Sequence, residues 1–309
     1  MQKRFFSIAV LCLCLSSFVF LSGCGESLFK GLDGDTEAST SSEANEDGNY
    51  TLGLSLAQKV IDNPNATDTE KQNAYVQKGI ALLGINNMSV LSLAEILKET
   101  DEDNIVETLS AIFEITPSAA ADIADAFNEA YTLGGGDLGL SALSATQLSS
   151  TASSLDSNKQ LLRGMANLSV VVKMTTRVFN IASDGSVTLT EETASYSDAL
   201  DYLLSGSRTV FYYAENAIDG FTSANAFTEY QLEQADKVRV AGLNLKNLYT
   251  AKEAIGAARL FTLRYYDTDG VSQNVTGNDA YTVTLRNTSV EEEADLETAL
   301  DAIFAYINN

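Results

Sequence analysis

The sequence predicts a mainly α-helical protein, built as a helical array or bundle of antiparallel helices. Apolar residues recur every three or four positions over most of the chain after residue 50, which is the helical period. Capping residues precede several of these stretches. The chain of 309 residues has only two prolines, Pro64 and Pro117, and both fall at predicted helix boundaries. A strand-like pattern is limited to residues 260–287, where we expect a small β-hairpin.

The N-terminal residues have the three zones of a secretion signal. Lys3 and Arg4 form a positively charged start, and residues 5–21 are an apolar run interrupted only by serines. This run is short and weakly flanked for a transmembrane helix. Residues 1–23 are therefore predicted to be a signal peptide that is removed.

The signal ends in Leu21-Ser22-Gly23-Cys24, which resembles the lipobox of bacterial lipoproteins. The resemblance implies that Cys24 receives a diacylglycerol, that a dedicated peptidase cuts before it, and that the freed amine is acylated. Two or three acyl chains hold a protein on a membrane stably. Gly25, and not Asp, follows the cysteine, so by resemblance to the enterobacterial sorting rule we expect the outer membrane, facing the periplasm. The alternative is an ordinary cleaved signal with an incidental cysteine.

Residues 24–49 are predicted to form a flexible acidic tether that begins at the lipidated cysteine. Between residues 25 and 48, seven acidic side chains accompany a single lysine, and most of the rest is Gly, Ser, Thr and Ala. A segment of this composition buries too little apolar surface to fold by itself. As a coil it would span ~25–30 Å.

Capping patterns mark the helices of a predicted N-terminal helical subdomain, residues 50–133. Thr67 and Glu70 have the spacing of a capping box. Thr116 is an N-cap residue followed directly by Pro117, which is favoured in the first helical turn. The apolar spacing predicts helices over residues 50–63, 68–84, 89–98, 105–115 and 117–133.

Residues 134–158 are rich in Ser, Gly and Ala and are predicted to be a boundary before a C-terminal helical subdomain, residues 159–309. The last helix of this subdomain is expected after a capping box of Ser289 and Glu292. The strand-like stretches 260–266 and 281–285 flank a turn and form the predicted hairpin. Apolar spacing predicts earlier helices over residues 161–179 and 227–258, and one or two helices over residues 194–218.

Composition excludes most catalytic and nucleic-acid functions. Loss of Lys3 and Arg4 with the signal takes the formal net charge from −23 to −25, which repels phosphate backbones. The chain has no histidine, so Ser-His-Asp catalysis and the usual zinc sites are excluded. Cys12 and Cys14 leave with the signal and Cys24 is blocked by lipid, so the mature chain has no thiol for a disulfide. We predict no catalytic residue, no metal site and no cofactor.

Residues 63–84 resemble the end of one tetratricopeptide-type repeat followed by the first helix of another. In that family, small residues let paired helices pack closely, and the stack forms a concave peptide groove. The sequence departs from the family pattern, since the gap between proline and glycine is longer and no second copy recurs at a fixed period. A generic helical hairpin explains the same residues. Those that carry the resemblance are Asn63, Pro64, Ala74, Tyr75, Gly79, Ala81, Leu83 and Gly84.

Aromatic residues gather in the C-terminal part of the chain. Such spacing is typical of a helical core. The functional alternative is an apolar groove between helices that admits a lipid tail, a quinone-like molecule or a partner helix. The candidate residues for this groove are Phe211, Tyr212, Phe221, Phe227 and Tyr230.

Three functional hypotheses follow from these observations. The leading one is a non-enzymatic, outer-membrane-anchored lipoprotein that acts as an interaction or assembly module for envelope proteins. The second is a carrier lipoprotein for an apolar small molecule, serving a transporter. The third is a carboxylate-based hydrolase, because paired Asp and Glu chemistry needs no histidine, although no particular acidic residues stand out.

Cys24→Ala is expected to leave an unprocessed or soluble protein, because the thiol that carries the lipid is lost. Membrane fractionation and intact mass measurement of the wild type and the variant test this. Normal membrane anchoring of the variant would show that Cys24 is incidental.

Overall fold

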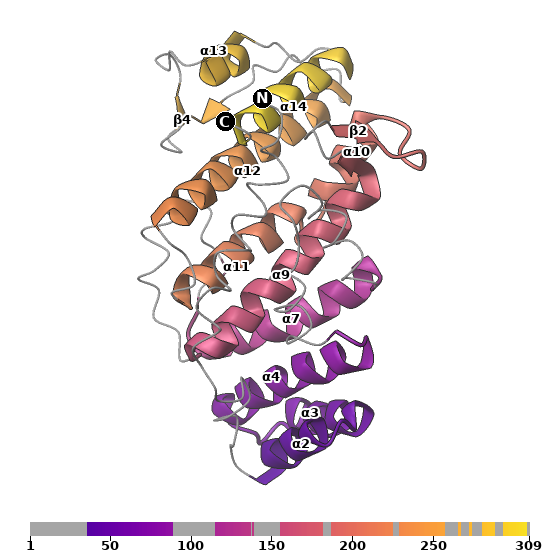
Figure 1. The fold of residues 1–309 in the computed structure, drawn as a ribbon, viewed down its shortest axis with the longest axis vertical. Coiled ribbons are helices and arrows are strands. Elements are labelled where there is room, and N and C mark those ends of the chain that lie inside the picture. Colours follow the sequence, from indigo (N-terminus) through magenta and orange to yellow (C-terminus); the bar gives the residue numbers. More distant parts are fainter. Residues whose placement is uncertain are drawn as a thin grey trace.

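The structure is a computed structural model whose described part is mainly α-helical, with ten helices and two small antiparallel hairpins. The predicted fold class is thereby confirmed. Most of the helices follow one another in sequence order along the long axis of the molecule, whereas the helix Tyr196–Leu204 lies beyond the helix that follows it and contacts the helices near the C-terminal end (Figure 1). The described residues are 36–88, 115–136, 138, 155–181, 187–224, 229–256, 265–266, 272–273, 280–287 and 293–307.

Side-chain caps define the first helices, as the sequence predicts. The Thr67 hydroxyl accepts a hydrogen bond from the Glu70 N–H at 3.2 Å, and the Glu70 carboxylate accepts one from the Thr67 N–H at 2.7 Å. This is a complete capping box. Thr116 caps a helix with Pro117 in its first turn. The predicted helix 89–98 lies outside the described residues, as does 105–115 except for its last residue. The first helices are α2 (Thr36–Glu46), α3 (Tyr50–Asp62), α4 (Asp68–Ile85) and α7 (Pro117–Leu133).

The middle of the array contains a long helix, a hairpin and two shorter helices. The helix expected to continue to residue 179 ends one residue earlier, and Phe179 instead pairs with Leu189 in the hairpin. The sequence reasoning missed this hairpin because Phe179 also fits the apolar helical spacing of the residues before it. These elements are α9 (Ser157–Val178), β1 (Phe179–Ile181), β2 (Val187–Leu189), α10 (Tyr196–Leu204) and α11 (Val210–Ser223).

The C-terminal elements confirm a small hairpin near residues 260–287 but change its second strand. Tyr265 pairs with Gln273, whereas the stretch 281–285 belongs to a helix. Leu285 of this helix is buried in a core cluster shared with the last helix. Packing thus overrides the strand-like alternation of a short segment. The capping box of Ser289 and Glu292 lies outside the described residues. The elements are α12 (Glu229–Gly256), β3 (Tyr265–Tyr266), β4 (Ser272–Gln273), α13 (Ala280–Asn287) and α14 (Glu293–Ile307).

The prediction of a flexible tether over residues 24–49 is wrong for α2. This helix packs on α3 and α4 through small and polar side chains, and both Ser41 and Asn45 are buried. The Ser41 hydroxyl donates to the Gly53 carbonyl at 2.7 Å, and the Asn45 amide donates to the Gln77 carbonyl at 3.0 Å. Composition does not reveal this helix, because buried hydrogen bonds rather than a large apolar face hold it in place.

Two large apolar clusters form most of the core, and α9 and α11 contribute to both. Met165 and Phe221 belong to the first cluster, together with residues of α4 and α7. Val178 and Phe211 belong to the second, together with residues of α10, α12 and α14. The first cluster includes side chains on both sides of the predicted boundary at 134–158. The helices before and after that segment therefore share a core.

Two glycines lie where α9 and α11 cross. A Cβ atom placed on Gly220 would lie 2.6 Å from the Gly164 nitrogen and 2.8 Å from the Gln160 carbonyl oxygen. These are backbone atoms, which cannot rotate aside as the end of a flexible side chain can. The close approach of the two helices therefore requires glycine at position 220.

In the described part of the chain, no helix is both long and apolar enough to cross a membrane. The predicted signal peptide and Cys24 lie outside the described residues, so the lipid anchor stays a prediction.

Gly220→Ala is expected to lower the free energy of unfolding by about 1–3 kcal/mol, because the added methyl group overpacks the helix crossing. In an uncrowded helix the same change would stabilise by up to ~1 kcal/mol, so the sign of the effect is diagnostic. Urea unfolding measures it. Thr69→Ala, at an exposed position of α4, serves as the control and should change stability by less than about 0.5 kcal/mol. A Gly220→Ala variant as stable as wild type would contradict the close crossing.

Candidate functional site

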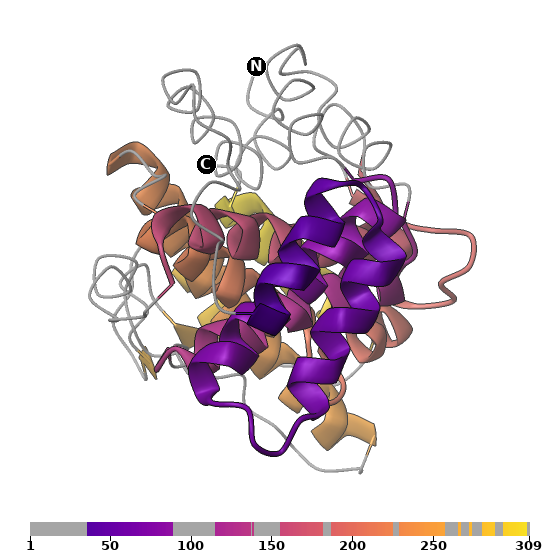
Figure 2. The same cartoon turned by 90° about the horizontal axis from the view of Figure 1, so that it is seen from below.

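An open groove of about 870 Å³ crosses three neighbouring helices near the N-terminal end of the array. α4 packs against α3 on one side and against α7 on the other, so α4 forms the floor and α3 and α7 form the walls. Arg208, from the connection between α10 and α11, adds to the α7 wall. Figure 2 shows this end of the array face-on, with α2, α3 and α4 in indigo.

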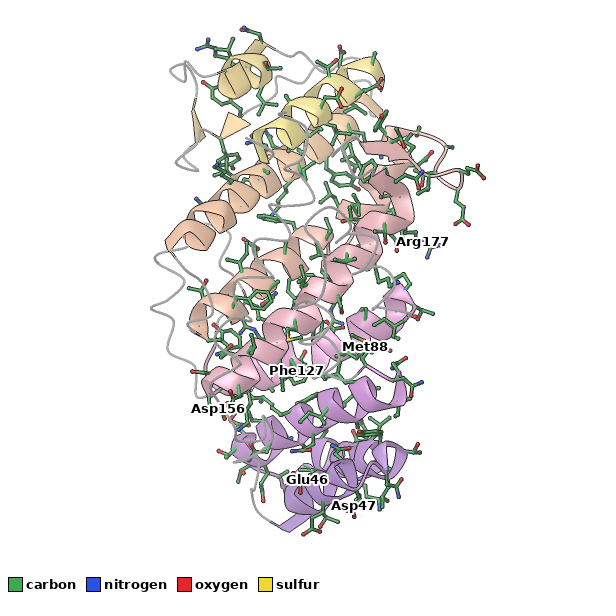
Figure 3. The ribbon with its side chains drawn as sticks, viewed as in Figure 1. Glu46, Asp47, Met88, Phe127, Asp156 and Arg177 are labelled. Atoms are coloured by element: carbon green, nitrogen blue, oxygen red, sulfur yellow. The ribbon has the colours of Figure 1, made fainter. Side chains whose placement is uncertain are left out.

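Two contacts show how the walls line up with the floor. Lys78 Nζ donates to Gln58 Oε1 at 3.2 Å between α4 and α3. Phe127 of α7, which is labelled in Figure 3, packs against Gly79 of α4, where an added Cβ would lie 2.7 Å from the ring. From these contacts, the lining residues can be grouped into three levels along the groove, each with one residue from α3, one from α4 and one from α7. Successive levels are about one helical turn apart. They are the acidic end (Asp62, Tyr75, Glu129), the middle level (Gln58, Lys78, Asp125) and the leucine end (Leu54, Leu82, Asp122).

At the acidic end, an aromatic ring of the floor is accompanied by a carboxylate from each wall. Burial raises the pKa of the Tyr75 hydroxyl, and the negative charges of Glu129 and then Asp62 raise it further. The Gln58 amide donates to Asp62 Oδ1 at 2.9 Å. Within the described residues, neither carboxylate forms an ion pair. This end of the groove therefore combines negative charge with an aromatic surface.

In the middle level, the acidic side chain is already paired. Asp125 forms an ion pair with Arg208 and accepts a hydrogen bond from the Tyr213 hydroxyl at 3.4 Å. Lys78 Nζ, besides its hydrogen bond to Gln58, lies 5.9 Å from the centroid of the Tyr75 ring. The middle level thus offers hydrogen-bonding groups without an excess of negative charge.

The leucine end provides the apolar surface of the groove. Leu54 of α3 and Leu82 of α4 are half-buried and both line the groove. The exposed Asp122 of α7 lies on the same level. Burial is the main reason that the pKa of Tyr213 is raised, and the charge of Asp122 adds a smaller upward effect. The apolar side chains at this end face a groove that is open to solvent.

The aromatic residues singled out in the sequence do not line this groove. Phe211 is buried in the second apolar cluster and Phe221 in the first. Tyr212 is half-buried and packs against the first cluster. Phe227 and the side chain of Tyr230 lie outside the described residues. The described members of the set therefore fill two different parts of the core.

The sequence reasoning did not identify the groove, although one signal was present. Asp122, Asp125 and Glu129 follow each other at spacings of three and four, which places them on one face of α7. Such a charged face usually means only that the helix is exposed to solvent. The charged face of α7 becomes part of a groove only because α3 supplies the other wall and α4 supplies the floor.

A second group of charged side chains is fully buried between α7, α9 and α11. Arg163 and Asp219 form an ion pair with no exposure to solvent. The Arg163 guanidinium lies 3.5 Å from the centroid of the Tyr131 ring and donates to the Asn216 carbonyl at 3.3 Å. Buried charges are tolerated when they are paired in this way. Because solvent does not reach these groups, they support the fold and not a binding site.

Glu215 of α11 is a partly buried carboxylate close to α12. Burial raises its pKa to about 7, and Lys246 and Arg239 only partly oppose that shift. Its Oε1 atom is buried and accepts no hydrogen bond from the described residues. The folded protein therefore favours the neutral acid more than the unfolded chain does.

Among the described residues, no three Asp, Glu or Cys side chains lie close enough together to hold a metal ion. Comparisons of the chain with protein-family models, with curated proteins and with solved structures find no match in any of the three. The groove and the sequence are thus the basis for a functional proposal.

Glu215→Gln is expected to stabilise the protein at pH 8 more than at pH 5. The pKa of Glu215 rises from an ordinary 4.5 to about 7 on folding. The contribution of neutral Glu215 to the free energy of unfolding is therefore complete below pH 4.5. As the pH rises from 4.5 through 7, the free energy of unfolding falls by ~2–3 kcal/mol, because the folded protein resists ionisation of this group. Gln stays neutral and avoids this loss. Chemical denaturation at both pH values measures the difference.

The matched control for this experiment is Glu192→Gln, which removes a carboxylate from an exposed turn. It should change stability equally at both pH values, within about 0.5 kcal/mol. If Glu215→Gln behaved like this control, the carboxyl group would not be desolvated in the folded protein.

Proposed function

We propose that this chain is a non-enzymatic bacterial lipoprotein that binds a segment of a partner envelope protein in the groove formed by α3, α4 and α7. The observation that carries the proposal is the groove itself, which is open, about 870 Å³ in volume, and lined by both polar and apolar side chains. Peptide-binding grooves combine apolar contacts with a few polar groups that set orientation.

The chemistry of the groove favours binding over catalysis. Thr51 and Ser55 are its aliphatic hydroxyl side chains, and both are exposed on the α3 wall. A hydroxyl nucleophile needs an adjacent base, and the chain has no histidine to serve as one. Asp125 is held by Arg208 and Tyr213. These groups are suited to hydrogen bonds and charge contacts with a ligand.

The proposed anchor would hold this groove close to a membrane. Lipidation of Cys24 would leave residues 25–35 between the lipid and the start of α2. Even fully extended, that connection spans at most about 40 Å. α2 packs directly on α3 and α4, which form one wall and the floor of the groove. The partner is therefore proposed to be an outer-membrane or periplasmic protein that approaches the same surface.

The carrier hypothesis has less support than the interaction hypothesis. It depended on an apolar groove around Phe211 and Phe221, and both side chains are buried in the core. The groove on α3, α4 and α7 is instead bordered by charged residues. An apolar ligand would leave these groups without the partners that a peptide backbone or a charged side chain supplies.

A photo-reactive residue in place of Ser55 is expected to cross-link one defined segment of a partner protein in bacterial cells. The full-length chain is used, and the cross-linked peptides are mapped by mass spectrometry. The same probe in place of Glu192, in an exposed turn outside the groove, is the control. Leu82→Arg should abolish the Ser55 adducts while the circular dichroism spectrum stays unchanged, because the added charge blocks the leucine end.

Two results would contradict the interaction hypothesis. Identical adducts from positions 55 and 192 would mean that contact is not made through the groove. A stoichiometric apolar molecule in an organic extract of the protein, released without any mapped adducts, would favour the carrier hypothesis.

A further inference from the structure

We infer that the groove selects an extended segment in which a Lys or Arg lies three residues from an apolar side chain. This inference rests on the proposed function and names the chemistry of the partner. The cationic side chain would occupy the acidic end, at Tyr75 between Asp62 and Glu129. The apolar side chain would contact Leu54 and Leu82 at the leucine end.

The acidic end is complementary to a cation in both charge and shape. The carboxylates of Asp62 and Glu129 act together on the Tyr75 hydroxyl from opposite walls, so a cation at the ring is attracted by both. A Lys or Arg side chain also gains from contact with an aromatic face.

The basic residues of the groove compensate this end only in part. Arg208 is paired with Asp125, and Lys78, which is hydrogen-bonded to Gln58, lies 5.9 Å from the centroid of the Tyr75 ring. Within the described residues, neither of them forms an ion pair with Asp62 or Glu129. Lys59, exposed on the α3 wall, makes no ion pair within the described part of the chain.

The middle level favours an extended segment over a helix. Lys78 can donate hydrogen bonds, and Gln58 can both donate and accept them. The backbone of an extended peptide has free N–H and C=O groups for such bonds, as in other modes of peptide recognition. The backbone groups in the middle of a helix are bonded to each other. The polar groups of the middle level would then gain no partner.

The distance between the two ends sets the spacing of the motif. From Tyr75 to Leu82, seven residues along α4 advance ~10.5 Å at ~1.5 Å per residue. An extended chain advances ~3.3 Å per residue, so about three residues cover the same distance. A helical ligand would need its two anchor residues about seven positions apart to match it.

Fluorescence anisotropy with the full-length protein in detergent micelles tests this motif. The reference probe is a labelled Ser/Gly-rich peptide with a leucine and a lysine three positions apart, made in both orders. Replacing the lysine by glutamate, or the leucine by serine, is expected to weaken binding roughly tenfold. Shifting the spacing to one or to seven should weaken binding as well. Equal binding of the lysine and glutamate peptides, or a preference for the spacing of seven, would overturn the inference.

A charge reversal in the protein makes the test independent of folding. Glu129→Lys is expected to bind the glutamate peptide more tightly than the lysine peptide, which inverts the wild-type order. Glu192→Lys, which makes the same change outside the groove, should keep the wild-type order. A Glu129→Lys variant that still prefers the lysine peptide would show that the cation does not bind at the acidic end.

The outcome separates this inference from the proposed function. If adducts from position 55 map to one partner segment but the peptides show no preference for the motif, the groove binds a partner of different chemistry and this inference is wrong. If neither adducts nor peptide binding are found, the proposed function fails as well.

Discussion

The crossing of α9 and α11 is the contact on which the rest of the structure depends. Both helices contribute to both apolar clusters, so a shift between them would disturb the whole core. Gly164 and Gly220 let the two backbones meet, and Arg163 and Asp219, their neighbours in sequence, form the buried ion pair. A register that separated this pair would leave a charge in the core, at a cost of about 3–5 kcal/mol.

The same contact positions the groove, because α9 packs directly on α7, which forms one wall of the groove. Arg163 stacks on Tyr131 of α7, and the side-chain amides of Asn128 and Asn167 exchange two hydrogen bonds of 2.9 Å between α7 and α9. α4 is held against α7 at Gly79. One wall and the floor of the groove are therefore fixed before any ligand arrives. A preformed groove loses less conformational entropy when it binds.

The sequence predicted the fold best where the structure depends on local interactions. The capping box at Thr67 and the N-cap at Thr116 were predicted, because each involves side chains and backbone groups a few residues apart. The prediction failed at α2 and at residues 281–285. α2 is held by hydrogen bonds to residues more than ten positions away. The helix at 281–285 is decided by the burial of Leu285 against other elements.

The sequence by itself determined the helical class, the capped helix starts at Thr67 and Thr116, the acidic charge and the lipobox-like motif at Cys24, because these depend on neighbouring residues or on composition. Only the tertiary structure decided which surfaces meet. It placed Phe211 and Phe221 in the core and brought Asp62, Tyr75 and Glu129 together from three helices. The periodicity of each helix shows which face is apolar, but it carries no information about which neighbour that face will meet.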